Sequence, residues 1–411
     1  MLNNIELKNQ KNIKRGWLFA IYTIITMCVY ILPALKIKVP YLLAGPLMLI
    51  SLVIIAIKDD KMLRYASILL LISVYFLLVN LIKNMSIADS LNDLIRNVRY
   101  FLPVMWGIYC LKNVGKKQQK TILICFLIIS GFMLYKTLSA LEKEPWIARM
   151  LAEDQATSDA EVNQYRLENV GGYPFSYMIG AVLLIIFWIS LSSKNFWIKL
   201  LCFATTILCY YYIIQTMYTT LLLLVSVGIV IITIVKIKNP LLKCVPIILF
   251  ALALLYLPVV LKYVSGLFDS DSLLTKKFMQ MYNAITGEGV EALGTRPELI
   301  SKAIDNWLKS PIFGAINYTP SHSTIIEYLQ QGGIVGFVLN LFMVVFSWKA
   351  CVNVLRKKSI EATLFNIILM YMMVLSFFND IRTCYEITIA VFFITMIVSV
   401  LFCKKKGVVN E

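Results

Sequence analysis

Long apolar segments recur along the whole of this 411-residue chain and constrain its fold more than any other feature. A helix needs about 20 apolar residues to cross a hydrocarbon core of roughly 30 Å. Twelve segments approach that length: 17–35, 39–57, 65–82, 98–111, 121–140, 173–191, 198–214, 218–235, 241–261, 323–348, 362–378 and 386–402. Charged residues make up 15% of the chain and its mean hydropathy is +0.77, which excludes a soluble domain. We expect an all-α, polytopic integral membrane protein, one membrane domain over residues 1–411 with about 12 transmembrane helices.

The distribution of Lys and Arg between the spans predicts their orientation. With the N-terminus inside, the cytoplasmic segments hold 23 of the 39 Lys and Arg and 5 of the 23 Asp and Glu. Cytoplasmic loops retain positive charge, so both termini are predicted to be cytoplasmic in a multi-pass protein of the cytoplasmic (inner) cell membrane. The net charge of +16 then reflects topology and does not predict nucleic-acid binding. The nine cysteines lie in or beside spans without CxxC spacing, so neither disulfides nor a metal site is expected.

Two connections are long, residues 141–172 and 262–322, and the charge count puts both outside the cell. No GxxxxGK[ST] motif for cytoplasmic ATP binding is present. In the second loop, Thr295 and Glu298 form a capping box that predicts an amphipathic helix over about 296–309. Arg296 lies beside the N–H groups and positive dipole of its first turn, which together favour an anion. The alternative is that Arg296 reaches lipid phosphates at the membrane surface.

The only histidine of the chain, His322, stands just before the tenth span. Thr324 and Glu327 there form a second capping box. Gly332 and Gly336 form a small-xxx-small pair that permits close approach of another helix. We therefore expect the imidazole at the outer mouth of a tightly packed span.

Arg96 and Arg99 lie three residues apart, which predicts a shared helix face at the outer end of the fourth span. The alternative is that both snorkel toward the membrane surface. The fourth span is short, and the helical spacing of Ile87, Leu91 and Leu94 predicts an interfacial helix that leads into it.

A signature of about 45 residues runs from Gly294 to Phe337. It reads G-x-R-x₁₀-W, then P-x-x-G, then H-S-x₃-E-x-L-x₃-G-x-x-G. Its positions are Gly294, Arg296, Trp307, Pro311, Gly314, His322, Ser323, Glu327, Leu329, Gly333 and Gly336. This pattern resembles the O-antigen ligase and polymerase superfamily. The resemblance implies a GT-C-like membrane glycosyltransferase that uses polyprenyl-diphosphate-linked (undecaprenyl-type) glycans without metal or cofactor.

The resemblance also implies roles for single residues. Arginines contact the diphosphate and a histidine activates the acceptor in such proteins, which makes Arg296 and His322 the catalytic candidates. Many relatives carry a Ser-Arg pair between two middle spans, where this chain has QTMY at residues 215–218 and no cation. Arg166, in YRLENVGGYPFSY before the sixth span, is the best substitute, with a solvated loop charge as its alternative. The candidate substrate-binding residues are Arg166, Arg96, Arg99 and Glu327.

The chemistry can also be argued from the residues alone. Transfer of a glycan from a lipid diphosphate needs cations that stabilise charge on the leaving group and a base that takes the acceptor's proton. Guanidinium binds phosphate oxygens bidentately, and a neutral imidazole can accept a proton. For a lone histidine such as His322, a structural role is the alternative.

Three functions remain open. The first is an extracytoplasmic polymerase that joins lipid-linked repeat units into capsular polysaccharide or O-antigen, with a flippase and a chain-length regulator as candidate partners. The second is a ligase that moves the glycan to another acceptor. The third is a flippase or exporter, which the scarcity of ionisable residues in the middle of the spans disfavours. Lys outnumbers Arg 30 to 9, which is typical of an AT-rich genome and favours a Gram-positive source without lipid A core, and hence the polymerase.

Overall fold

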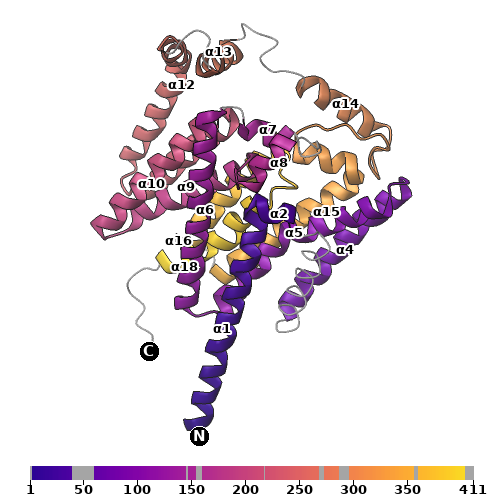
Figure 1. The fold of residues 1–411 in the computed structure, drawn as a ribbon, viewed down its shortest axis with the longest axis vertical. Coiled ribbons are helices and arrows are strands. Elements are labelled where there is room, and N and C mark those ends of the chain that lie inside the picture. Colours follow the sequence, from indigo (N-terminus) through magenta and orange to yellow (C-terminus); the bar gives the residue numbers. More distant parts are fainter. Residues whose placement is uncertain are drawn as a thin grey trace.

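Every regular element in the described part of the chain is a helix (Figure 1). The computed structural model describes residues 2–38, 60–144, 147–153, 160–216, 218–267, 273–286, 296–355 and 360–402. Nine helices within these ranges are long and apolar enough to cross a membrane. The all-α class and the polytopic membrane character expected from the sequence are therefore confirmed.

Eleven of the twelve predicted spans fall on helices, and the second, residues 39–57, lies outside the described residues. These helices are α1 (Leu2–Ile31), α4 (Asp60–Ile82), α5 (Ile87–Asn113), α6 (Lys116–Lys143), α9 (Tyr173–Ser192), α10 (Phe196–Gln215), α11 (Thr219–Lys236), α12 (Cys244–Ser265), α15 (Thr324–Leu355), α16 (Ile360–Phe378) and, in one run, α17 (Tyr385–Thr388), the π-helical turn η3 (Ile389–Ile394) and α18 (Thr395–Phe402). The helix predicted to lead into the fourth span forms the first turns of α5, which Ser86 caps by accepting from the Asp89 N–H (3.1 Å).

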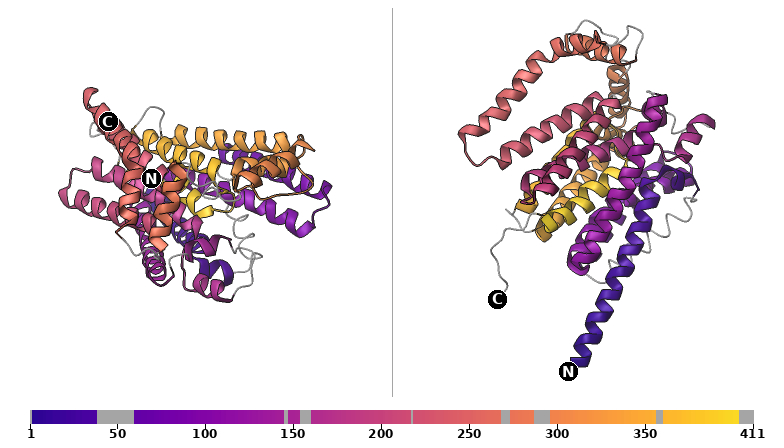
Figure 2. Two further views of the ribbon diagram at one scale, coloured as in Figure 1. Left: turned by 90° about the horizontal axis from the view of Figure 1, so that it is seen from above. Right: turned by 60° about the vertical axis from the view of Figure 1, so that its left-hand side comes forward.

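Shorter helices lie in the connections between the long ones, most of them in the two long connections. They are α2 (Pro33–Lys38), α7 (Ile147–Glu153), α8 (Ala160–Leu167), α13 (Leu273–Thr286) and α14 (Arg296–Leu308), with η1 (Leu241–Lys243) before α12. Figures 1 and 2 show α13 and α14 at the end of the bundle opposite to the start of α1. We call the end that carries α7, α8, α13 and α14 the loop end. The described parts of both long connections are thus mostly helical.

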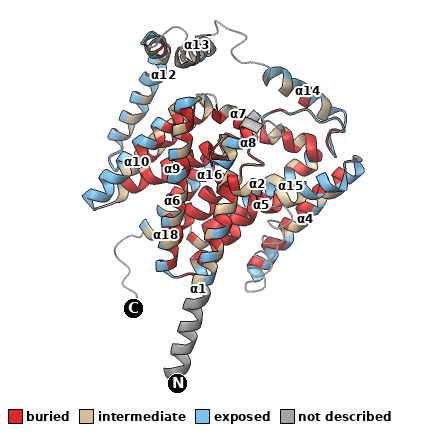
Figure 3. Cartoon of the chain, in the orientation of Figure 1, coloured by how far each residue is buried: buried red, intermediate tan, exposed pale blue. Residues whose placement is uncertain are grey.

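The core forms around α9, which is buried on nearly every side and packs against α10, α11, α16 and α17. Trp106 on α5 and Trp188 on α9 are among the largest fully buried side chains. At the periphery, α12 buries only Leu261 and Ser265 of its 22 residues (Figure 3). Most of its other apolar side chains are exposed, as suits a helix surrounded by lipid.

The small-residue pair on α15 packs as its spacing predicts. A side chain at Gly332 would lie 2.6 Å from the ring of Phe76, and one at Gly336 would lie 3.0 Å from the same ring. The predicted close approach is confirmed, with an aromatic ring of α4 filling the space. This contact holds α4 and α15 together beside the loop end.

Candidate functional site

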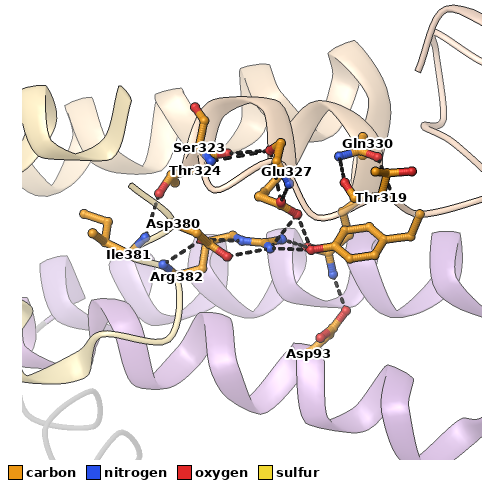
Figure 4. A network of polar contacts seen from close by, with 12 residues as sticks. Asp93, Thr319, Ser323, Thr324, Glu327, Gln330, Asp380, Ile381 and Arg382 are labelled. Carbon is orange, nitrogen blue, oxygen red and sulfur yellow. Dashed lines mark hydrogen bonds and ion pairs between the residues drawn. The ribbon is translucent and has the colours of Figure 1, made fainter. Parts of the chain in front are cut away.

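Charged and polar side chains, half of them buried, converge at the start of α15 (Figure 4). They come from α5, from the segment between α14 and α15, from α15 itself and from the connection between α16 and α17. We call this group the Arg382 cluster. Its members are Asp93, Arg96, Tyr318, Ser321, Glu327, Gln331, Asp380 and Arg382. Such buried charges in a membrane protein are costly unless they are paired, so they mark a candidate functional site.

Arg382 is the centre of the cluster and is 5% exposed. Its Nε and Nη2 donate to Oδ1 and Oδ2 of Asp380, each at 2.9 Å, in a bidentate pair. The same Nη2 donates to Oε2 of Glu327 at 2.8 Å, and Nη1 donates to the side-chain oxygen of Gln331 at 3.1 Å. All three nitrogens of the guanidinium are therefore engaged, and its orientation is fixed.

Glu327 is 1% exposed, and both of its carboxylate oxygens accept hydrogen bonds from the protein. Oε1 accepts from the backbone N–H of Ser321 at 2.6 Å and from the Ser321 hydroxyl at 3.0 Å. Oε2 accepts from Arg382 and from the Tyr318 hydroxyl. A carboxylate so enclosed holds the preceding segment in place, and the sequence-based role of Glu327 in direct substrate binding stays a prediction.

The structure contradicts the capping box predicted for Thr324 and Glu327, because both side chains bond to partners other than each other's backbone N–H. Glu327 reaches back past Thr324 to Ser321, as described above. The hydroxyl of Thr324 donates to the Asn379 carbonyl at 2.9 Å and accepts from the Ile381 N–H at 2.9 Å. The residue pattern is that of a cap, but contacts with a segment 55 residues later in the chain replace the local ones.

A second row of contacts joins the cluster to α5. The side-chain oxygen of Gln331 accepts from Arg96 at 3.2 Å as well as from Arg382, and its amide donates to Asp93. Asp93 also pairs with Arg96 at 2.7 Å and accepts from Asn80 of α4 at 2.7 Å. One glutamine therefore connects the two guanidinium groups of the cluster.

His322 occupies a strained turn directly beside the cluster. Its φ is 58°, in the left-handed region that costs a residue other than glycine about 1–3 kcal/mol. The side chains on either side of it, Ser321 and Ser323, are buried, whereas His322 itself is exposed. The reversal in backbone direction thus turns both serines inward and leaves the imidazole at the surface of the loop end.

The helix α15 is broken nine residues after it begins. Gly333 has φ 64° and ψ −165°, and a side chain there would strike the carbonyl of Ile312. Two backbone hydrogen bonds hold the segment 311–315 against the break. The N–H of Ala315 donates to the Gln330 carbonyl and the N–H of Ile334 donates to the Pro311 carbonyl, both at 2.8 Å. Thr324–Gly332 is consequently a separate half-helix that carries Glu327 and Gln331.

Carbonyl groups released by the break find side-chain donors. Nζ of Lys83 donates to the carbonyls of Gln330 and Gln331 at 3.1 and 2.7 Å, and the Tyr75 hydroxyl donates to that of Gly332 at 2.8 Å. A cation at the C-terminal end of a helix complements its dipole. Partial burial lowers the pKa of Lys83 to about 8.

Burial and neighbouring charges shift the pKa of two groups of the cluster outside the spans. Burial alone would raise the pKa of Asp380. The charge and hydrogen bonds of Arg382 outweigh burial and hold this pKa below the ordinary value of 3.8. Burial raises the pKa of Tyr318 to about 12, where the neighbouring Glu327 adds to the rise and Arg382 opposes it. Asp380 is therefore ionised and Tyr318 is a neutral donor at physiological pH.

Arg96 and Arg99 lie three residues apart on α5, as expected for neighbours on a helix surface, but their side chains contact different partners. Arg96 turns toward Gln331 of α15, whereas Arg99 lies between the rings of Tyr30 (5.3 Å) and Tyr385 (4.4 Å). Arg99 is 5% exposed, so it does not snorkel to the membrane surface either. Arg96 therefore contacts α15, whereas Arg99 contacts α1 and α17.

The other two predicted cations lie in the long connections. Arg166 on α8 is half-buried and donates to the side chain of Asn163 and to the carbonyl of Leu151, both at 3.4 Å. These bonds hold it against α7. Arg296 begins α14, where the sequence predicts a helix start, but its side chain and Thr295 lie outside the described residues.

Sequence reasoning missed Asp380 and Arg382, the most deeply engaged pair. A signal was present, because Arg382 and Asp380 stand two residues apart in a short outer connection, where the charge rule does not favour a cation.

Among the described residues, no group of three His, Cys, Asp or Glu is placed to hold a metal ion. Comparison with models of known protein families finds no match, and no curated protein matches the chain.

Proposed function

We propose that this protein is a membrane glycosyltransferase that polymerises polyprenyl-diphosphate-linked oligosaccharide units into a capsular polysaccharide or O-antigen on the outer face of the cytoplasmic membrane. The observation that carries the proposal is the His322 turn. It displays a strained and exposed imidazole beside a buried cluster of ion pairs that fixes the residues on both sides of it. Strain maintained by such a network is a feature of reactive sites.

The proposed reaction assigns the imidazole to the acceptor. His322 accepts the proton of the attacking hydroxyl as the bond from the sugar's anomeric carbon to the diphosphate breaks and the new glycosidic bond forms. The diphosphate leaves with its negative charge, which requires cations nearby. The two guanidinium groups of the Arg382 cluster already face three carboxylates, those of Asp93, Glu327 and Asp380. Cations outside the cluster, with Arg296 and Arg166 as the candidates, therefore bind the diphosphate in this proposal.

A transporter is the alternative that the break in α15 favours, because transporters build their sites on interrupted helices. In a transporter the interrupted backbone lines the substrate or ion site. Here the carbonyl groups of Gln330, Gln331 and Gly332 accept instead from Ala315, Lys83 and Tyr75. Most ionisable residues of the described spans also lie near the ends of the helices, with Arg96 and Arg99 in the middle of α5 as exceptions. The polar site therefore supports chemistry at one face better than passage across the membrane.

A ligase would use the same site with another acceptor, so the decisive experiment offers both. Purified protein in lipid nanodiscs is supplied with a labelled lipid-linked repeat unit, alone or with a second glycan acceptor. A ladder of products from the donor alone indicates the polymerase, and a single addition that depends on the acceptor indicates the ligase. No new glycosidic bond in either reaction would contradict the proposal.

The matched variant is His322→Gln, which can hydrogen-bond but cannot take up the proton. We expect its rate to fall by about 10²–10⁴-fold with the protein folded at normal abundance, and lipid-linked single units to accumulate in cells. Arg296→Lys retains the charge but loses the bidentate fork and should also slow transfer. Wild-type turnover by His322→Gln would remove the histidine from the reaction.

A further inference from the structure

The turn that displays His322 is held from both sides by one distant segment, the connection between α16 and α17. On the C-terminal side, the Thr324 hydroxyl bonds to Asn379 and Ile381, and the Thr324 N–H donates to the Asn379 carbonyl at 3.3 Å. On the N-terminal side, Ser321 is held by Glu327, and Glu327 is held by Arg382. The position of the imidazole therefore depends on residues that lie far from His322 in the sequence.

Each link on the N-terminal side is short and involves a charged group, and Arg382, Glu327 and Ser321 are buried. Asp380 fixes Arg382 through two bonds of 2.9 Å, Arg382 binds Glu327 at 2.8 Å, and Glu327 accepts two bonds from Ser321. The Ser321 hydroxyl also lies 3.4 Å from the Ser323 N–H across the turn. Because charge-assisted bonds are directional, a displacement of Arg382 is transmitted to the backbone at residue 321.

We propose that Arg382 is a positioning residue for His322, which acts through Glu327 and Ser321 to hold the left-handed turn. The cluster has two features that suit this role. Its carboxylates outnumber its guanidinium groups, so Arg382 is poorly disposed to bind an anionic substrate itself. The half-helix Thr324–Gly332 is also separated from the rest of α15 by the break at Gly333. The rest of α15 therefore does not by itself fix the turn at His322.

This inference rests on the proposed function only where it concerns rate, since the geometry can be tested without any glycan. His322 is the only histidine of the chain, so protein labelled with ¹³C-histidine gives the signal of a single imidazole. The variants are Arg382→Lys, which keeps the charge but not the fork, and Ser321→Ala, which removes only the hydroxyl link. The matched control is Arg64→Lys, at an exposed position near the start of α4.

We expect the imidazole resonance to move in Arg382→Lys and in Ser321→Ala and to stay in place in Arg64→Lys. With lipid-linked donor, kcat of Arg382→Lys should fall by about 10²-fold at an unchanged KM, as a misplaced reactive group predicts. Ser321→Ala keeps every charge, so it serves if Arg382→Lys does not fold.

The outcomes separate the two proposals. A resonance that stays at the wild-type position in both cluster variants overturns the positioning role of Arg382. A rise in KM with kcat unchanged overturns it as well, because Arg382 would then bind substrate. A resonance that moves while kcat remains at the wild-type value supports the positioning and instead overturns the catalytic role of His322.

Discussion

At the scale of residues, the buried charges of the Arg382 cluster contribute to stability only as long as each keeps its partner. Glu327 and Arg382 are almost fully buried, and removal of one partner from such a pair leaves the other charge uncompensated. That loss costs about 3–5 kcal/mol in soluble proteins. Asp380 is more exposed, at 27% of its side chain, so its contribution is smaller and partly screened.

The depressed pKa of Asp380 predicts a pH-dependent stability with a definite sign. The unfolded carboxyl has a pKa near 3.8 and the folded one a lower pKa, so the unfolded state binds more protons between them. The stabilisation by Asp380 is complete above 3.8 and is lost as pH falls through the folded pKa. In thermal unfolding of the detergent-solubilised protein, the difference in melting temperature between wild type and Asp380→Asn should shrink below about pH 4.

The matched control for this measurement is Asp305→Asn, an exposed position on α14. We expect this variant to follow the wild-type pH dependence throughout. Parallel curves for wild type and Asp380→Asn down to about pH 3 would mean that the Asp380–Arg382 pair contributes no pH-dependent stability.

At the scale of elements, the break in α15 sets the geometry of the site. Gly333 requires a positive φ, and the segment around Ile312 lies where a side chain would be. The break frees the half-helix Thr324–Gly332 to meet α5 and the α16–α17 connection. A continuous α15 would release the backbone bonds from Ala315 and Ile334.

Gly333→Ala should therefore destabilise the protein by at least about 1 kcal/mol, because alanine is incompatible with the native backbone there. Gly131→Ala on α6 is the control, since Gly131 is helical and a Cβ there would meet no atom within 4 Å. It should be neutral or stabilising by up to about 1 kcal/mol. Melting temperatures in the same detergent compare the two, and equal effects would show that the break carries no strain.

At the scale of the molecule, the polar groups of the site and the long connections lie together at the loop end. The Lys and Arg distribution predicts that this end is extracytoplasmic, because it assigns the short basic connections to the cytoplasmic side. The proposed reaction needs this orientation, since lipid-linked glycans are polymerised after their transfer across the membrane in the proposed pathway.

Cysteine labelling tests the orientation in intact cells. With the nine native cysteines replaced, Lys302→Cys on α14 should react with a membrane-impermeant maleimide, and Lys117→Cys at the start of α6 should react only after permeabilisation. Both positions are exposed, so accessibility within the fold does not bias the comparison. The reverse pattern would invert the topology and move the Arg382 cluster to the cytoplasmic face.

Much of the architecture follows from the sequence because it depends on local chemistry. The length and apolarity of the spans predict their helices, as α9 and α16 show, and the glycine spacing predicts the close packing at Gly332 and Gly336. The helix predicted to begin at Arg296 corresponds to α14 (Arg296–Leu308). These features depend on neighbours within a few turns of helix, which the sequence displays directly.

The site itself was decided by the tertiary structure. No periodicity relates Arg382 to Glu327 or to the distant Asp93, and the capping pattern at Thr324 predicts local partners that distant ones replace. The side chains of Arg96 and Arg99 have different partners because Arg96 meets α15, whereas Arg99 meets α1 and α17. The left-handed turn at His322 persists because Ser321 and Thr324 are bound from elsewhere in the chain. Sequence determines where a helix forms from the chemistry of adjacent residues, whereas charge pairing and backbone strain depend on which helices meet in space.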